Sequence, residues 1–217
     1  MATSPHSEQA TRPNLSFFNL PSPLRQASYF ATGALAGAST IPIEYAWSTL
    51  TGPKTPATLP LLRSHAFALT GRAGTRFWVF DITKSHLPAA LPVWFTGGLL
   101  GATGGLAEVC AQSLFQRKIP GLRALLSQGG KLFFCFGTYT YLSTTLSPQE
   151  LPPRPFWYCW LMGATAGGVG CAIVNGLEGV RGRALWLGAV PKGILTIGTV
   201  IAVQVTSCAE VLNRVDP

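Results

Sequence analysis

Six long apolar stretches occupy most of this 217-residue chain, and three of the short breaks between them are rich in proline. A helix needs roughly 20 mostly apolar residues to cross the hydrocarbon core of a bilayer, and each stretch is long enough. Only 11% of the residues are charged, against roughly 25% in an average soluble domain. This leaves too little charge to cover a water-facing surface. We therefore predict six membrane-spanning helices, at residues 26–50, 64–87, 93–115, 124–146, 156–179 and 190–211.

The residues before the first stretch differ from the rest of the chain. Residues 1–25 are polar and contain prolines, without the charged start and apolar core of a secretory signal, so we predict a mobile tail followed by a membrane domain at 26–214. The net charge is +8, but the basic residues are dispersed and accompany no nucleic-acid-binding motif. We therefore expect the lipid bilayer, and no nucleic acid, as a partner.

The chain shows no pattern typical of an enzyme, a cofactor site or a metal site. Its five cysteines stand singly in apolar runs, which indicates buried thiols rather than disulfides or zinc ligands. Its glycine-rich runs lack the Lys-Ser/Thr that ends a phosphate-binding loop. We expect no enzymatic activity, no cofactor and no metal.

Basic residues are concentrated on one side of the predicted bundle. The loops after the first, third and fifth helices hold eight of them, and the opposite side holds four. Such an excess marks the side of the membrane on which loops are retained, and an even number of spans then places both termini on the other side. The eight are Lys54, Arg63, Arg117, Lys118, Arg123, Arg181, Arg183 and Lys192, and the four are Arg25, Lys84, Arg154 and Arg214.

The first, third and fifth predicted helices share a pattern of two glycines four residues apart, followed by a glutamate. Glycines at this spacing allow two helices to approach closely in lipid. The second glycine precedes the glutamate by seven residues in two copies and by eleven in the third, a difference of about one helical turn. The chain therefore reads as three two-helix repeats, at about 26–88, 92–147 and 156–214. The packing glycines are Gly33, Gly37, Gly97, Gly101, Gly163 and Gly167.

This threefold pattern resembles the mitochondrial carrier family, whose odd helices carry P-x-[DE]-x-x-[KR] and whose even helices end in [FY]-[DE]-x-x-[KR]. Pro42 and Glu44 match part of the first motif, Glu178 and Arg181 match the same motif in the third repeat, and residues 80–84 match the second motif fully. The resemblance implies an all-α bundle of six transmembrane helices with pseudo-threefold symmetry. It also implies transport of a small solute across the mitochondrial inner membrane.

The resemblance further implies two sets of charged residues that close the bundle alternately, one at each side. The glutamates of the odd helices and the ends of the even helices supply these gates. The matrix-side gate would use Glu44, Glu108, Glu178 and Arg181, and the opposite gate Asp81, Lys84, Glu210 and Arg214. Carboxylates near a membrane need partners or water, so we expect these acids to pair with Arg181, Lys84 or Arg214, or else to be solvated at the interface.

Polar residues at membrane depth are candidates for the lining of a central cavity. A basic residue at that depth indicates function unless it is neutralised. It can meet an anionic solute in the cavity, or it can pair with an acid or extend to the interface. Both interpretations remain open for the three basic residues. The cavity candidates are Arg72, Arg76, Gln128 and Lys131.

The chain also departs from the family pattern. Trp47 and Ala111 stand where the motif has a base, and the even helix of the second repeat has no acid near Thr140. These departures favour an alternative in which the chain does not transport. It would then be a carrier-like or Tim17-type structural or assembly subunit, with a protein partner in a mitochondrial membrane complex.

Overall fold

The computed structural model describes residues 22–51, 59–116, 119–146 and 154–215, and within these ranges the chain is helical and contains no strand. The predicted all-α class is therefore confirmed. Most of the N-terminal tail, together with Lys54, Arg117 and Lys118, lies outside the described residues. The elements are α1 (Ser22–Ser39), α2 (Ile41–Thr51), α3 (Leu59–His86), α4 (Val93–Gln116), α5 (Leu122–Thr145), α6 (Phe156–Leu177), the π-helical η1 (Ala184–Ala189) and α7 (Val190–Val215).

Each predicted apolar stretch corresponds to one helical segment. The first segment, predicted as one helix, is divided at Thr40 into α1 and α2. Pro42 lacks the N–H that would bond to the carbonyl one turn earlier, and a proline is tolerated only in the first turn of a helix. The backbone N–H of Thr40 bonds to Gly37 O at 3.2 Å, and its hydroxyl donates to the same oxygen at 2.8 Å. A new helix therefore begins after Thr40.

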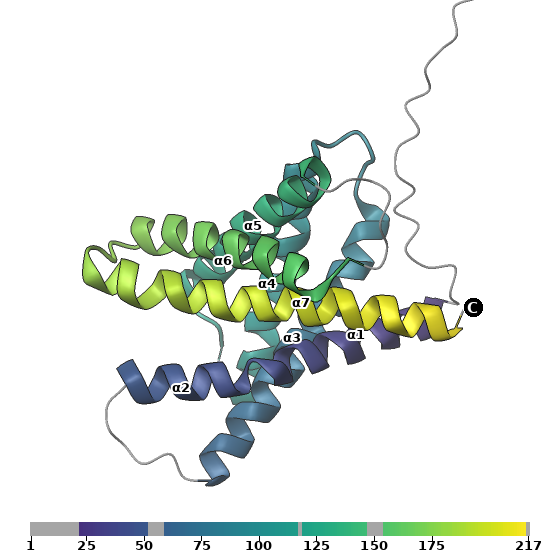
Figure 1. Cartoon of the computed structure of the whole chain (residues 1–217). Coiled ribbons are helices and arrows are strands. Elements are labelled where there is room, and N and C mark those ends of the chain that lie inside the picture. Colours follow the sequence, from purple (N-terminus) through teal and green to yellow (C-terminus); the bar gives the residue numbers. More distant parts are fainter. Residues whose placement is uncertain (1–21, 52–58, 117–118, 147–153, 216–217) are drawn as a thin grey trace, which may run out of the picture.

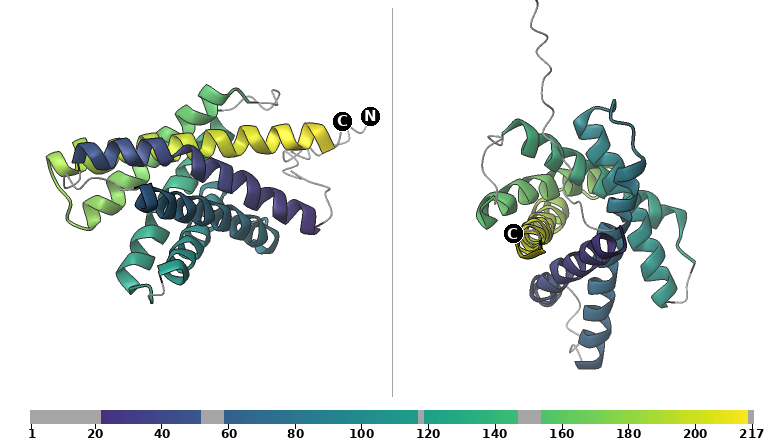
Figure 2. Two further views of the ribbon diagram at one scale, coloured as in Figure 1. Left: turned by 90° about the horizontal axis from the view of Figure 1, so that it is seen from below. Right: turned by 90° about the vertical axis from the view of Figure 1, so that its right-hand side faces the viewer.

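The helices pack as three hairpins, each made of two segments that are consecutive in the chain. In hairpin 1 (residues 22–86) α1 packs on α3, in hairpin 2 (93–145) α4 packs on α5, and in hairpin 3 (156–215) α6 packs on α7. Between hairpins, α3 packs on α4, α5 on α6, and α7 returns to α1 (Figure 1). The hairpins therefore form a closed cycle. The start of α1 and the end of α7 lie at the same end of the molecule (Figure 2).

Glycines allow close approach inside every hairpin. A Cβ atom built on any of the six packing glycines would lie 2.9 Å or less from an atom of the partner helix. The tightest are Gly97, against the Thr140 hydroxyl, and Gly101, against the carbonyl oxygen of Leu132, both at 2.2 Å. Because any larger residue at these positions would push the helices apart, the glycine pairs position the two helices of each hairpin against each other.

Apolar side chains fill the middle of the cycle. Phe77 of α3 lies edge-on to Phe136 of α5, with ring centroids 6.1 Å apart, and Phe80 lies 5.2 Å from the same ring. Side chains from α1 and α7 complete this core, so α1, α3, α5 and α7 meet through apolar contacts. The buried members are Ala36, Phe77, Leu132, Cys135, Phe136, Ile197, Val200 and Ile201.

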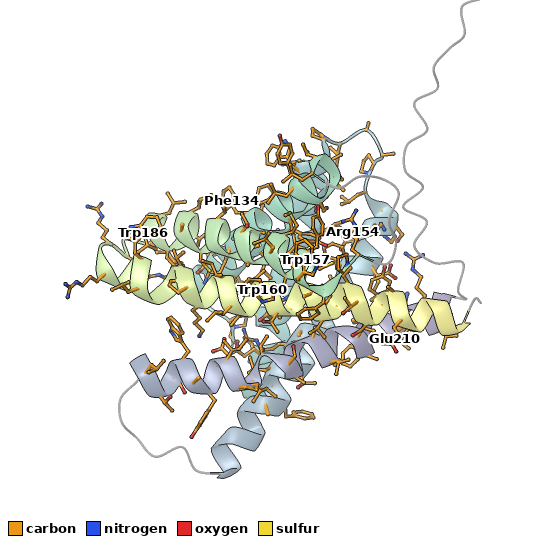
Figure 3. All side chains as sticks on the ribbon, in the orientation of Figure 1. Phe134, Arg154, Trp157, Trp160, Trp186 and Glu210 are labelled. Atoms are coloured by element: carbon orange, nitrogen blue, oxygen red, sulfur yellow. The ribbon has the colours of Figure 1, made fainter. Side chains whose placement is uncertain are left out.

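Two helices are long and apolar enough to cross a membrane, Phe156–Leu177 and Ala184–Val211, by length and composition within the described residues. Large apolar side chains also cover the outside of α6, where Trp157 is 65% exposed and Leu161, Val169 and Ile173 follow at four- or eight-residue spacing. Residues four apart share one helix face. An apolar stripe of this length on the outside of a helix is typical of contact with lipid or with another protein. Trp186 stands at one end of hairpin 3 and Glu210 near the other (Figure 3).

Candidate functional site

A buried carboxylate lies at the contact between hairpins 1 and 2. Glu108 of α4 is 3% exposed and accepts hydrogen bonds from two arginines of α3. Arg72 donates to its Oε1 from Nε at 3.0 Å and from Nη2 at 2.5 Å. Arg76 donates to Oε2 from Nε at 2.9 Å and also from Nη2, and Gln128 of α5 donates to Oε2 at 3.2 Å. We call these four residues the Glu108 network.

The local sequence explains how one carboxylate reaches two neighbouring helices. Arg72 and Arg76 are four residues apart, so both side chains leave the same face of α3. Gly104 precedes Glu108 by one turn, and a Cβ there would lie 2.9 Å from the Arg76 side chain. Gly105 lies against the backbone of Gln128, also at 2.9 Å. These two glycines bring α4 close enough to α3 and α5 for Glu108 to contact both.

The Glu108 network does not neutralise all of its positive charge. Two arginines share one carboxylate, and Nη1 of Arg76 is buried without a hydrogen-bond partner. Burying an unpaired donor in a low-dielectric interior is unfavourable. The Glu108 network therefore keeps a surplus of positive charge in the interior.

A second ion pair joins hairpins 1 and 3. Lys192 Nζ at the start of α7 lies 2.8 Å from Glu44 Oε2 in α2. The side chains are 40% and 20% exposed. Because an exposed pair is screened by solvent, this contact is weaker than the Glu108 network. The break in the helix at Thr40 allows α2 to lie against α7, which brings the two side chains together.

A third ion pair lies within hairpin 1. Arg25 donates to Asp81 Oδ1 from Nε at 3.0 Å and from Nη2 at 2.6 Å, and Asp81 is 6% exposed. The Arg25 guanidinium also lies 5.9 Å from the centre of the Tyr29 ring, a cation–π distance. The pair fastens the start of α1 to the end of α3.

The structure separates the residues of the expected matrix-side gate. Glu44 and Glu108 take part in two different ion pairs, with Lys192 and with the arginines of α3. Glu178 follows the last turn of α6 and Arg181 is exposed in the next turn, and within the described residues neither takes part in an ion pair. The predicted pairing with Arg181 is therefore wrong for Glu44 and Glu108, which have other partners. Arg181 lies beyond the end of α6, in the turn that begins with Gly179 at φ 86°.

The expected opposite gate is also divided. Asp81 pairs with Arg25, with Lys84 half-buried one turn further along α3. Glu210 is exposed on α7 (Figure 3). It borders a hollow of about 360 Å³ that residues of α1 and α7 line. The side chain of Arg214 lies outside the described residues.

The four candidate cavity residues fall into two groups. Arg72, Arg76 and Gln128 converge on Glu108, which supports the interpretation that the arginines are paired with an acid. Lys131 stands one turn after Gln128 on α5, and no described residue forms an ion pair with it. The hollow of about 360 Å³ on α1 and α7 and one of about 280 Å³ on α4 and α5 include none of these side chains.

Two bases of these ion pairs were absent from the predicted sites. Arg25 and Lys192 both stand near the start of a helix, where the sequence offers no sign of an ionic partner. The partner of Arg25 could have been predicted from the hairpin topology. In a hairpin the start of α1 must lie near the end of α3, which carries Asp81. The partner of Lys192 could be predicted only if the packing of hairpin 3 on hairpin 1 were already known.

The described residues contain no group of three or more His, Cys, Asp or Glu side chains that could hold a metal ion. The five cysteines are free thiols. Comparison with family models, with curated proteins and with solved structures finds no match to this chain. The resemblance to mitochondrial carriers therefore remains a hypothesis.

Proposed function

We propose that the protein is a carrier-like integral membrane protein that moves a small solute across the mitochondrial inner membrane. In this proposal all six helical segments cross the bilayer, and the three hairpins are related by a pseudo-threefold axis. The closed cycle of hairpins and the apolar outer face of α6 support this arrangement. The membrane named here rests on the resemblance to carriers alone.

The observation that carries the proposal is that ion pairs, and not only apolar contacts, join the hairpins. The Glu108 network connects hairpin 1 to hairpin 2, and the Glu44–Lys192 pair connects hairpin 3 to hairpin 1. Inside each hairpin the helices are held by close glycine contacts, to which the Arg25–Asp81 pair adds in hairpin 1. An ion pair between hairpins can therefore open while each hairpin stays intact, as an alternating mechanism requires.

The two contacts differ in strength, which indicates where the bundle opens. The Glu44–Lys192 pair is partly exposed and contributes at most about 1 kcal/mol. Separating Glu108 from its arginines would leave buried charges unpaired, at a cost of about 3–5 kcal/mol. A conformational equilibrium that a solute can shift needs states within a few kcal/mol of each other. Hairpin 3 therefore moves relative to hairpins 1 and 2, and the apolar core between α3, α5 and α7 separates in the same step.

Exchange of radiolabelled carboxylates, amino acids, nucleotides and phosphate by purified protein in lipid vesicles tests the proposal. We expect exchange of at least one of these solutes, its loss in Glu44→Lys, and its recovery when Lys192→Glu is added. Glu178→Gln is the matched control, because Glu178 takes part in no ion pair within the described residues. Failure of the double exchange of charge to restore transport would show that this ion pair is not a gate.

A second candidate is a transport-inactive structural subunit of a mitochondrial membrane complex, carrier-like or Tim17-type. The packed core favours it, because Phe77, Leu132 and Ile201 occupy the place where a solute path would run. This candidate predicts that the protein purifies in mild detergent with a partner of fixed stoichiometry and exchanges no solute. Solute exchange by protein purified alone supports the first candidate.

A further inference from the structure

Two lysines occupy corresponding places in hairpins 2 and 3. In hairpin 2 a Cβ at Gly101 would lie 2.2 Å from the carbonyl oxygen of Leu132, and in hairpin 3 a Cβ at Gly167 would lie 2.3 Å from that of Gly193. Each is the second glycine of its pair, so Leu132 and Gly193 are equivalent in the two hairpins. The residue before each is a lysine, Lys131 in α5 and Lys192 in α7.

Within the described residues, only Lys192 of these two lysines forms an ion pair with a carboxylate of the next hairpin. Lys192 pairs with Glu44, which follows Gly37 by seven residues, and Glu108 follows Gly101 by the same seven. In hairpin 3, seven residues after Gly167, the chain has Val174. Val174 is 5% exposed and its Cγ2 would lie 3.7 Å from a Cβ on Gly130, so it lies at the contact between α5 and α6. A valine therefore stands where two other hairpin contacts have a glutamate.

Lys131 faces this same contact. A Cβ on Gly170 of α6 would lie 2.7 Å from the carbonyl oxygen of Lys131 and 2.3 Å from Sγ of Cys135, one turn further along α5. Arg76 of α3 and Gln128 of α5, one turn before Lys131, both donate to Glu108 Oε2, and the Arg76 side chain is 8% exposed with Nη1 unpartnered. A lysine of α5 and a buried arginine of α3 with one unpartnered N–H thus stand at neighbouring positions of the bundle.

The charges around this region do not balance. Arg72, Arg76 and Lys131 carry three positive charges, and Glu108 supplies the one negative charge that the described ion pairs bring to them. Charges are costly inside a protein or a bilayer unless they are paired. An external carboxylate is the group that satisfies both donors, since it is what the chain itself uses at the two corresponding contacts.

We propose that the α5–α6 contact binds a small carboxylate ligand in the place of the glutamate that hairpin 3 lacks at Val174. Lys131 forms the ion pair with the ligand, and Nη1 of Arg76 supplies a second donor. The bound carboxylate completes the third connection of the cycle, between hairpins 2 and 3, and so stabilises the closed bundle. The proposal concerns binding and holds whether or not the ligand crosses the membrane.

Thermal unfolding of the purified full-length protein in detergent tests this proposal. Sodium acetate and sodium succinate are compared with sodium chloride and sodium phosphate at one ionic strength. A ligand that binds the folded state raises the melting temperature in proportion to its occupancy. We expect a saturable rise with the carboxylates, and at least about tenfold weaker apparent binding in Lys131→Met.

Substitution of Val174 provides the matched pair of variants. Val174→Glu supplies the missing carboxylate within the chain, and Val174→Gln has the same size without the charge. We expect Val174→Glu to melt at a higher temperature than Val174→Gln without added ligand, and to lose the response to acetate. Val174→Gln should keep a response.

Three results would each overturn the proposal. They are a rise of equal size with chloride or phosphate, an undiminished acetate response in Lys131→Met, and a Val174→Glu variant that melts no higher than Val174→Gln. Because the test uses protein without a membrane, its failure leaves the transport test of Glu44 and Lys192 unaffected. Loss of transport would equally leave carboxylate binding to be judged on its own.

Discussion

Removal of the Glu108 carboxylate is the perturbation for which the structure predicts the largest effect. Glu108 accepts five hydrogen bonds, four of them from arginines, and is almost fully buried. In Glu108→Gln the amide nitrogen would face arginine N–H groups, donor against donor. Arg72 is 21% exposed and can regain some water, whereas Arg76 at 8% cannot. Breaking a buried ion pair by removing one partner costs about 3–5 kcal/mol.

The free energy of unfolding, measured by titration with SDS in mixed micelles, provides the assay. We expect Glu108→Gln to lower it by about 3–5 kcal/mol. The matched control is the triple variant Arg72→Met, Arg76→Met, Glu108→Met, which removes all the charges and keeps the volume. Replacement of a complete buried ion-pair network by apolar residues is often neutral or stabilising, so we expect the triple variant to lie within about 1 kcal/mol of wild type or above it.

Two results would refute this reasoning. A cost below about 1 kcal/mol in Glu108→Gln would mean that water reaches the arginines and that the network is not buried in solution. A triple variant as unstable as the single variant would mean that the loss comes from packing around α4 and not from unpaired charge.

Three further predictions follow from other contacts. Gly101→Ala should lower the free energy of unfolding by about 1–3 kcal/mol, because its Cβ would lie 2.2 Å from the partner helix. The control Gly176→Ala has open space around it and should have no such cost. Equal effects of the two substitutions in SDS titration would contradict the packing role of Gly101. Glu44→Gln should cost less than about 1 kcal/mol in the same titration, since the pair with Lys192 is partly exposed, and a larger loss would show a stronger pair. Trp157 should be quenched by lipids with brominated acyl chains, since it lies 65% exposed on the outer face of α6, and unquenched emission would count against contact with lipid there.

The sequence predicted the helical segments well because their signals are local. The lengths of the apolar stretches and the prolines between them place the helices within a few residues, and α4 begins at Val93 as predicted. The break at Thr40 was missed, although Pro42 provided the signal for it. Within the described residues two segments are long and apolar enough to cross a membrane, and insertion of all six stays a prediction.

The polar residues of the site were mostly identified, but their partners were not. The sequence selected Glu44, Asp81 and Glu108 as acids that need a partner, and each forms an ion pair. The bases that meet them are Arg25, Lys192 and the two arginines of α3. The contacts made by Arg25, Arg72 and Arg76 join residues 32 to 56 positions apart in the chain. Spacing in the sequence carries no information over such distances, which explains the error.

Glycine spacing and apolar length are properties of single helices, so the chain alone was sufficient to predict three glycine-bearing helices, each followed by a second helix. The pairing of charges depends on how each helix is rotated and at what level it crosses its neighbours. A shift of one turn moves a side chain by about 5.4 Å, more than the length of an ion pair. The displacement of the third glutamate to Glu178, which leaves Val174 against Gly130 next to Lys131, became meaningful only once the helices were packed.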